Sequence, residues 1–203
     1  MLITNIISKR LRNHKEELIG YLSKNLLLQK FSSYRLDLKQ KRVAIIGPAI
    51  SAYEDEKGDY IDGYDIVVRI NKALPIKEQD KKFIGTKTDF LFHGLDETPI
   101  SGCGTIDTRL WKQSGVKLFY PLNDDYLKRF LDGFHKKNIS LMPLRQIEKN
   151  QYNEIKSKLE GYIPTTGFAA IYTILNSNVS EVYITGFTFF KTGYQKGYRD
   201  EIQ

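Results

Sequence analysis

The sequence is poor in the residues that build several common kinds of site. Its single cysteine, Cys103, excludes an internal disulfide and a zinc site of four cysteines, and it fits a reducing compartment. The three histidines, His14, His93 and His135, lack the spacing of metal ligands. No apolar run approaches the ~18 residues of a membrane span, and the N-terminus lacks the order of a signal peptide. We therefore expect a soluble, cytoplasmic domain.

Several catalytic and binding motifs are also missing. The glycine pattern of dinucleotide-binding folds and the phosphate loop of NTPases do not occur, which argues against NAD enzymes and ordinary NTPases. The sequence has no HExxH or CxxC zinc motif and no serine-hydrolase elbow. It also lacks an Asp-x-Asp motif of the kind that holds a divalent ion on a sugar nucleotide. We therefore expect no metal site.

The composition is that of a globular protein with a positive charge. The chain has 203 residues, of which 41% are hydrophobic and 27% charged, so one domain with a full core is expected. The net charge of +7 favours an anionic partner, such as a phosphate, a nucleotide or an acidic membrane face. The 13 tyrosines show no nucleic-acid-binding spacing, so core packing explains them and no nucleic acid is expected.

Residues 1–40 are predicted to form a basic, helical extension. Apolar residues recur every three or four positions from Leu2 to Leu26, with basic residues such as Lys9 and Arg12 largely on the other side. Such a helix packs on its own domain or on a second subunit, rests on an anionic membrane surface through residues 1–30, or forms a nucleic-acid-binding arm. The sequence leaves these alternatives open, and with them the oligomeric state.

From residue 41 onward, short apolar runs alternate with helical patterns. The runs predict buried strands at 42–47, 64–71, 88–94, 116–120, 139–142 and 181–186. Helices are predicted at 123–136, 146–159 and 167–176. This alternation indicates an α/β fold with a mostly parallel, Rossmann-like sheet flanked by helices. We therefore expect an extension over 1–40 and an α/β domain over 41–203.

In such a sheet, ligands bind beyond the carboxyl ends of the strands, so the residues at those ends are candidates for a site. Gly47 follows the first strand and allows either a tight turn or the close approach of a ligand. Asn71 follows the second strand, where it either closes a turn or contacts a base or ribose. His93 and Gly94 follow the third strand, and His93 is either a satisfied structural residue or a catalyst. We expect His135 to be solvated.

A second candidate lies at the start of the helix predicted at 167–176. Thr165, Thr166 and Gly167 follow a proline, so hydroxyl and backbone N–H groups gather at the positive end of a helix. This arrangement either caps the helix or binds a phosphate or carboxylate.

Several segments can be compared together with the motifs of known families, beginning with Val43-Ala-Ile-Ile-Gly-Pro-Ala and Ile61-Asp-Gly-Tyr-Asp-Ile-Val-Val-Arg-Ile-Asn-Lys-Ala. These two segments resemble the large motif of sialyltransferases of glycosyltransferase families 29 and 42. The stretch that follows this motif is matched by Phe83-Ile-Gly-Thr-Lys-Thr-Asp. The small motif is matched by Ile163-Pro-Thr-Thr-Gly-Phe-Ala-Ala and Val182-Tyr-Ile-Thr-Gly-Phe. The segments occur in the family's order from about residue 41 to 190.

The resemblance implies a GT-A-like variant of the Rossmann fold and a glycosyltransferase. The expected reaction is a metal-independent, inverting transfer of sialic acid from CMP-sialic acid to a hydroxyl of a glycan or glycolipid. The CMP-sugar is then a substrate, and no cofactor is expected. Alternatives are a transferase for another CMP- or nucleotide-linked sugar, and a non-catalytic nucleotide- or glycan-binding module of the same fold. We expect an enzyme, cytoplasmic or peripheral to the inner face of a membrane.

The resemblance also assigns site residues. The donor-binding candidates are Gly47, Pro48, Ala49, Asn71, His93, Gly94, Thr165, Thr166, Gly167, Gly186, Phe187 and Thr188. Tyr194 is the catalytic candidate, because a phenol from Tyr194 or Tyr198 would contact the leaving phosphate.

The sequence departs from the family pattern in three places. The family's small motif is followed by a histidine that acts as general base, and no histidine follows His135 here. Either the chain is truncated before this histidine, as we expect, or another group serves as the base, or the protein does not catalyse. Pro48 and Ala49 stand where the family often has Asn or Ser, which removes a side-chain contact with the donor. Phe190 stands where bacterial members have a tyrosine.

Overall fold

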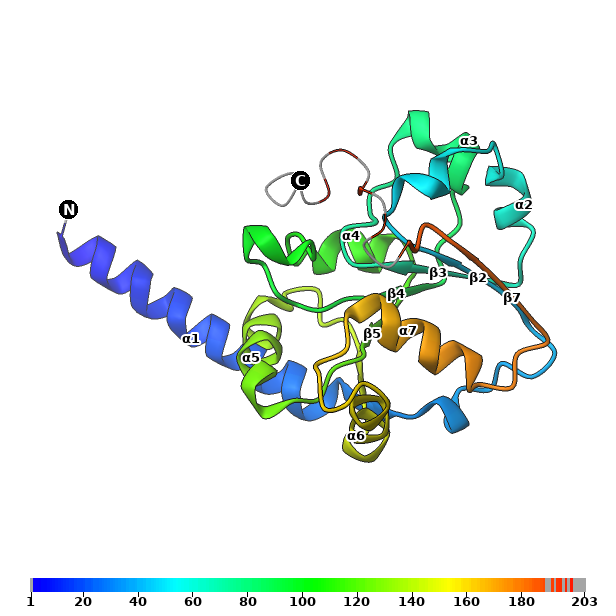
Figure 1. Cartoon of the computed structure of the whole chain (residues 1–203). Coiled ribbons are helices and arrows are strands. Elements are labelled where there is room, and N and C mark those ends of the chain that lie inside the picture. Colours follow the sequence, from blue (N-terminus) through cyan, green and yellow to red (C-terminus); the bar gives the residue numbers. More distant parts are fainter. Residues whose placement is uncertain (1, 189–190, 192, 195, 197, 199–203) are drawn as a thin grey trace.

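The computed structural model describes residues 2–188, 191, 193, 194, 196 and 198. For residues 2–7 this description covers the backbone alone. Its centre is a seven-stranded sheet in the order β1-β6-β5-β4-β3-β2-β7 (Figure 1), in which all neighbours run parallel. The strands are β1 (Leu28–Phe31), β2 (Arg42–Ile46), β3 (Ile66–Ile70), β4 (Phe90–Phe92), β5 (Lys117–Tyr120), β6 (Leu144–Ile147) and β7 (Glu181–Thr185). The expected Rossmann-like α/β fold is therefore confirmed.

Helices cover the sheet. They are α1 (Leu2–Leu26), α2 (Gly58–Asp62), α3 (Lys81–Ile84), α4 (Thr108–Gln113), α5 (Lys128–Lys137), α6 (Lys149–Lys158) and α7 (Thr166–Leu175). The side chains of β2 alternate between the two faces of the sheet. Val43 and Ile45 join the large core beside α7, whereas Ala44 and Ile46 join a smaller core beside α2 and α3. Burial on both faces explains why the strands are continuous apolar runs.

The strand order places a crevice at the carboxyl end of the sheet. The chain adds β3, β4, β5 and β6 in turn on one side of β2, and β7 then returns to the other side of β2. A reversal of this kind separates the loops that follow the strands on either side, and ligands of open α/β sheets bind at such a point. The loops after β2, β3, β4 and β7 are therefore the first place to look for a site.

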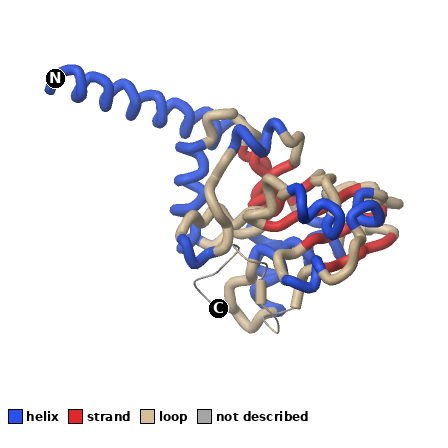
Figure 2. The backbone as a smooth tube through the Cα atoms, turned by 90° about the horizontal axis from the view of Figure 1, so that it is seen from above, coloured by secondary structure: helices blue, strands red, loops and turns tan. Residues whose placement is uncertain are grey.

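Helix α1 leaves the body of the protein. Its N-terminal half projects clear of the domain in both views (Figures 1 and 2), and residues 8–18 are all exposed. The C-terminal half packs on α5 through a buried polar group: Ser23 Oγ lies 2.7 Å from His135 Nδ1 and accepts a hydrogen bond from Asn138 Nδ2 at 2.8 Å. None of the described helices is both long and apolar enough to cross a membrane.

Three expectations from the sequence were wrong in detail. The segment 1–40 is not helical throughout, because Leu28–Phe31 forms β1 and pairs with β6 at the edge of the sheet. Residues 139–142 form a turn instead of a strand, because the Asn138 side chain bonds both the N–H and the C=O of Met142. The strand follows at Leu144–Ile147, so α6 begins at Lys149, later than expected.

His135 is also corrected, since it is buried against α1 rather than solvated. Burial lowers the pKa of its imidazole to about 4, so the ring is neutral near pH 7. Its Nε2 has no hydrogen-bond partner among the described residues. The contact of Nδ1 with Ser23 is therefore the polar interaction that holds this ring in place.

We predict that Ser23→Ala destabilises the protein by about 1–3 kcal/mol, because it leaves buried His135 Nδ1 without a partner and removes one of the two hydrogen bonds that Asn138 Nδ2 donates. Urea unfolding at pH 7 measures this change. The matched control is Ser157→Ala on the exposed surface of α6, where the cost should stay within about 0.5 kcal/mol. Equal effects of the two substitutions would contradict the role given to Ser23.

Candidate functional site

A cavity of about 320 Å³ opens at the carboxyl end of the sheet, where the strand order reverses. This main cavity is within the size range of small-molecule sites. All but two of the predicted site residues line it. They are Pro48, Ala49, Asn71, Gly94, Thr165, Thr166, Gly167, Gly186, Phe187, Thr188 and Tyr194. Loops at the carboxyl ends of the strands and the start of α7, which are distant in sequence, therefore line one cavity.

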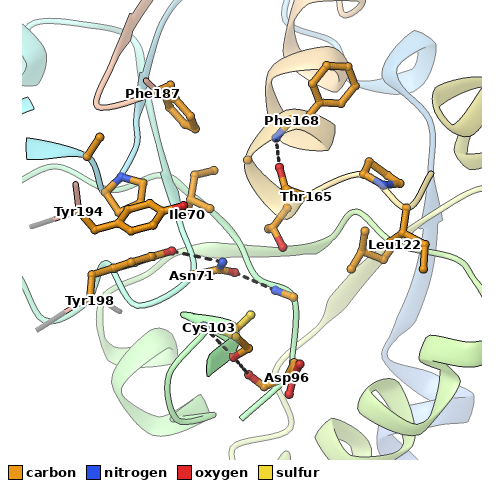
Figure 3. Close-up of a pocket in the computed structure, with 18 of the residues that line it drawn as sticks. Ile70, Asn71, Asp96, Cys103, Leu122, Thr165, Phe168, Phe187, Tyr194 and Tyr198 are labelled. Carbon is orange, nitrogen blue, oxygen red and sulfur yellow. Dashed lines mark hydrogen bonds between the residues drawn. The ribbon is translucent and has the colours of Figure 1, made fainter. Parts of the chain in front are cut away.

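Asn71 follows β3 and lies in the wall of this cavity (Figure 3). Its Oδ1 accepts a hydrogen bond from the Gly94 N–H at 2.9 Å, and its Nδ2 donates to the Tyr198 hydroxyl at 3.4 Å. Its backbone has a φ of 54°, a left-handed conformation that asparagine tolerates better than most residues. Asn71 thus closes the turn after β3, ties β3 to the loop after β4, and still faces the cavity.

Helix α7 begins on the other side of the cavity. Thr165 caps it, since its Oγ1 accepts from the Phe168 N–H at 3.2 Å. Thr166 Oγ1 makes no hydrogen bond with the described residues, although the residue is only 8% exposed. The capping alternative therefore holds for Thr165. The Thr166 hydroxyl lies at the positive end of the helix, where the other alternative would place a ligand.

Three glycines let the walls of the site approach one another. A Cβ on Gly47 would lie 2.3 Å from the carbonyl oxygen of Gly186, and a Cβ on Gly186 would lie 2.3 Å from the carbonyl oxygen of Gly47. Gly186 also has a φ of +75°. A Cβ on Gly167 would lie 2.8 Å from the ring of Phe187. The ends of β2 and β7 and the start of α7 can meet in this way only without side chains.

The C-terminal segment completes the cavity. Tyr194 pairs with Ala49 in an isolated antiparallel bridge, and the rings of Tyr194 and Tyr198 lie 5.2 Å apart. In Figure 3 both tyrosines lie across Asn71 from Thr165. The phenol candidates therefore reach the site. Phe190, the other residue singled out in this segment, lies outside the described residues.

The two remaining candidates sit behind the wall. Gly47 touches the end of β7 and lines a neighbouring cavity instead. His93 is 1% exposed, its ring packs 4.8 Å from that of Trp111, and its Nδ1 accepts from the Leu95 N–H at 2.9 Å. Burial lowers the pKa of His93 to about 4, so its imidazole is neutral near pH 7. The structure places His93 in a supporting position beside Gly94.

Some lining residues were not predicted. Asp96 and Cys103 lie in the loop after β4, below Asn71 in Figure 3. The rule that selected His93 and Gly94 could have reached Asp96 three residues later, but the loop carries no motif. Burial raises the pKa of the Cys103 thiol, so it is protonated near neutral pH. Among the described lining residues, Asp96 is the only charged side chain.

The described histidines and acidic residues do not converge elsewhere either. No three side chains of His, Cys, Asp or Glu in the described part of the chain gather in a way that could hold a metal ion. His14 lies on the projecting half of α1 and His135 at the contact with α5. The main cavity itself is lined chiefly by hydroxyl, amide and apolar groups.

We predict that Gly186→Ala is far more destabilising than Gly115→Ala. Gly115 has a similar φ of +69°, but a Cβ there would meet nothing within 4 Å. Gly115→Ala should therefore cost only the left-handed backbone penalty of about 1–2 kcal/mol, whereas Gly186→Ala adds a clash with Gly47. Thermal unfolding of both variants measures the difference. Similar losses would mean that the two strand ends can separate without cost.

Comparison with known proteins bears on the fold. No protein-family model matches the chain, and no curated protein sequence matches it. Among solved structures, it is similar to a mammalian sialyltransferase with a TM-score of 0.51 and 20% identity, over 77% of this chain and 58% of that one. It is equally similar to a mammalian sialyltransferase in complex with Gal-beta-1-3GalNAc-ortho-nitrophenol, at 20% identity and a TM-score of 0.51, over 77% of this chain and 59% of that one. The match thus spans less than two thirds of these neighbours, and it shows that the chain has their α/β fold.

Proposed function

We propose that this protein is a glycosyltransferase that takes sialic acid from CMP-sialic acid and transfers it, with inversion, to a hydroxyl of a glycan. The observation that carries the proposal is the convergence of the motif residues on one cavity of suitable size. Asn71, Thr166 and Gly186 are far apart in sequence, yet they line the same cavity. The similarity of the fold to that of sialyltransferases supports it.

The cavity is suited to stabilising a leaving phosphate. In the proposed reaction, the bond between the sugar's anomeric carbon and the phosphate oxygen breaks, and its electron pair stays on the phosphate of CMP. The acceptor oxygen forms the new bond on the opposite face of the sugar, and its proton passes to solvent water. Negative charge therefore builds on the phosphate, where hydrogen-bond donors fixed in advance have the greatest effect.

The chain supplies such donors without a metal in this proposal. The Thr166 hydroxyl and the N-terminal N–H groups of α7 lie on one wall, and the phenols of Tyr194 and Tyr198 line the cavity with them. We assign these groups to the phosphate, and Asn71 and Gly186–Thr188 to the nucleoside. The proton of the acceptor is not assigned to His14, His93 or His135, because none of them lines the cavity.

The wider setting of the reaction stays a prediction. A glycan or glycolipid acceptor fits the proposed transfer, and the exposed lysines and arginines of α1 would attract an anionic membrane, each by roughly 1 kcal/mol near the surface. A transferase for a different CMP-linked sugar would use the same nucleotide contacts. The nucleotide that the protein binds is therefore the first property to test.

We predict that CMP raises the melting temperature more than UMP, GMP or NAD, and that EDTA does not change this shift. A ligand that binds only the folded state raises the free energy of unfolding by about 2.7 kcal/mol at a hundredfold excess over Kd.

Asn71→Ala should weaken CMP binding about tenfold, as the loss of ~1–2 kcal/mol of hydrogen bonding implies.

The control variant is Asn153→Ala, on the exposed surface of α6, which should bind CMP as the parent does. A larger shift with another nucleotide, or a shift that EDTA removes, would contradict the proposed donor or the metal-independent reaction. Equal CMP binding by Asn71→Ala and the parent would remove Asn71 from the site.

A further inference from the structure

A second cavity lies beside the main one. Its volume is about 120 Å³, which is several times the ~10–15 Å³ that one water requires. Pro48, Ile70 and Tyr198 line both cavities, so they form a shared wall. A group bound in the second cavity would therefore lie next to a ligand in the main one. Of the residues assigned to the donor, only Gly47, Pro48 and Tyr198 line this cavity.

The second cavity is strongly basic, unlike the main one. Its described lining includes four cationic side chains, Arg69, Lys72, Lys77 and Lys196, against a single carboxylate, Asp80. The lysines are exposed at the rim, while Arg69 and Asp80 are buried. The rest of the lining is isoleucine, alanine, proline and glycine, together with the two tyrosines Tyr53 and Tyr198. Apolar walls with a few charged groups are typical of sites for small organic anions.

Arg69 is the residue that makes this cavity unusual. It is 1% exposed, and its Nε donates to Lys87 O and Thr88 Oγ1 while its Nη2 donates to Ile84 O. Its Nη1 makes no hydrogen bond with any residue that the structure describes. Burial lowers the pKa of Arg69 to about 10, which leaves the guanidinium charged at neutral pH. A buried arginine that keeps an unused N–H group beside a cavity is suited to an anionic oxygen.

We propose that the second cavity binds the carboxylate or phosphate group of an acidic sugar, and that this sugar belongs to the acceptor. The assignment of the acidic sugar to the acceptor rests on the proposed function, because it assumes that the donor lies across the shared wall in the main cavity. The binding of an anion in the second cavity does not depend on the proposed function. Arg69 would hold the anionic oxygens at the base of the cavity, and the lysines would draw the anion in from the rim. The acceptors of this protein are then acidic glycans.

Isothermal titration at low salt tests the proposal with three probes: glucuronate, galactose 6-phosphate and galactose. We expect the two anions to bind and neutral galactose to bind at least tenfold more weakly. Binding should persist at saturating CMP, because the two cavities are separate. No binding of either anion to the folded protein, or displacement of both by CMP, would overturn the proposal. If one anion alone binds, its chemistry identifies the acidic group.

Lys77 provides the variant series, because it lies on the exposed rim and its substitution leaves the core intact. Lys77→Gln should weaken anion binding about two- to fivefold, the range for an exposed charge pair. Lys77→Glu should weaken it further, and Lys77→Arg should restore it. Lys39→Gln removes an equal charge elsewhere on the surface and serves as the control. Anion binding that is unchanged across the Lys77 series would also overturn the proposal. A parent protein that binds the anions but does not bind CMP would instead contradict the assignment of the donor to the main cavity.

Discussion

The site depends on the close approach of two backbone segments, at Gly47 and Gly186. These glycines end the neighbouring strands β2 and β7, and a Cβ on either would overlap the carbonyl oxygen of the other. Because β7 lies on the side of β2 opposite β3, their contact fixes one wall of the crevice where the strand order reverses. Phe187 then crosses to the start of α7, where Gly167 leaves room for its ring. The close contacts at Gly47, Gly186 and Gly167 thus hold together the segments beside the main cavity.

The two cavities differ in the charge of their linings. The described lining of the main cavity holds one charged side chain, Asp96, among hydroxyl and amide groups. The second cavity gathers four cations around buried Arg69. Hydrogen-bonding groups at a helix end suit the phosphate of a nucleotide, whereas a basic cavity suits a second anion. The positive charge of the whole chain, from which the sequence predicted an anionic partner, is thus partly concentrated beside the main cavity.

The fold and most of the site could be predicted because they follow from local patterns. Buried parallel strands are continuous apolar runs, and their carboxyl ends identify Gly47, Asn71 and Gly186. Strand β6 was misplaced because Arg145 and Gln146 interrupt its apolar pattern, and Gln146 is paired with Lys30 of β1. The burial of His135, the unused Nη1 of Arg69 and the second cavity depend on contacts across the fold. No spacing in the sequence could reveal them.

A crystal structure of the protein grown with millimolar CMP tests the central claim most directly. The account predicts that the nucleotide lies in the main cavity, with its phosphate at the start of α7 near Thr166 and its nucleoside against Asn71 and Gly186. Electron density for CMP at another place on the protein would contradict it. So would an empty main cavity in crystals whose protein is saturated with CMP.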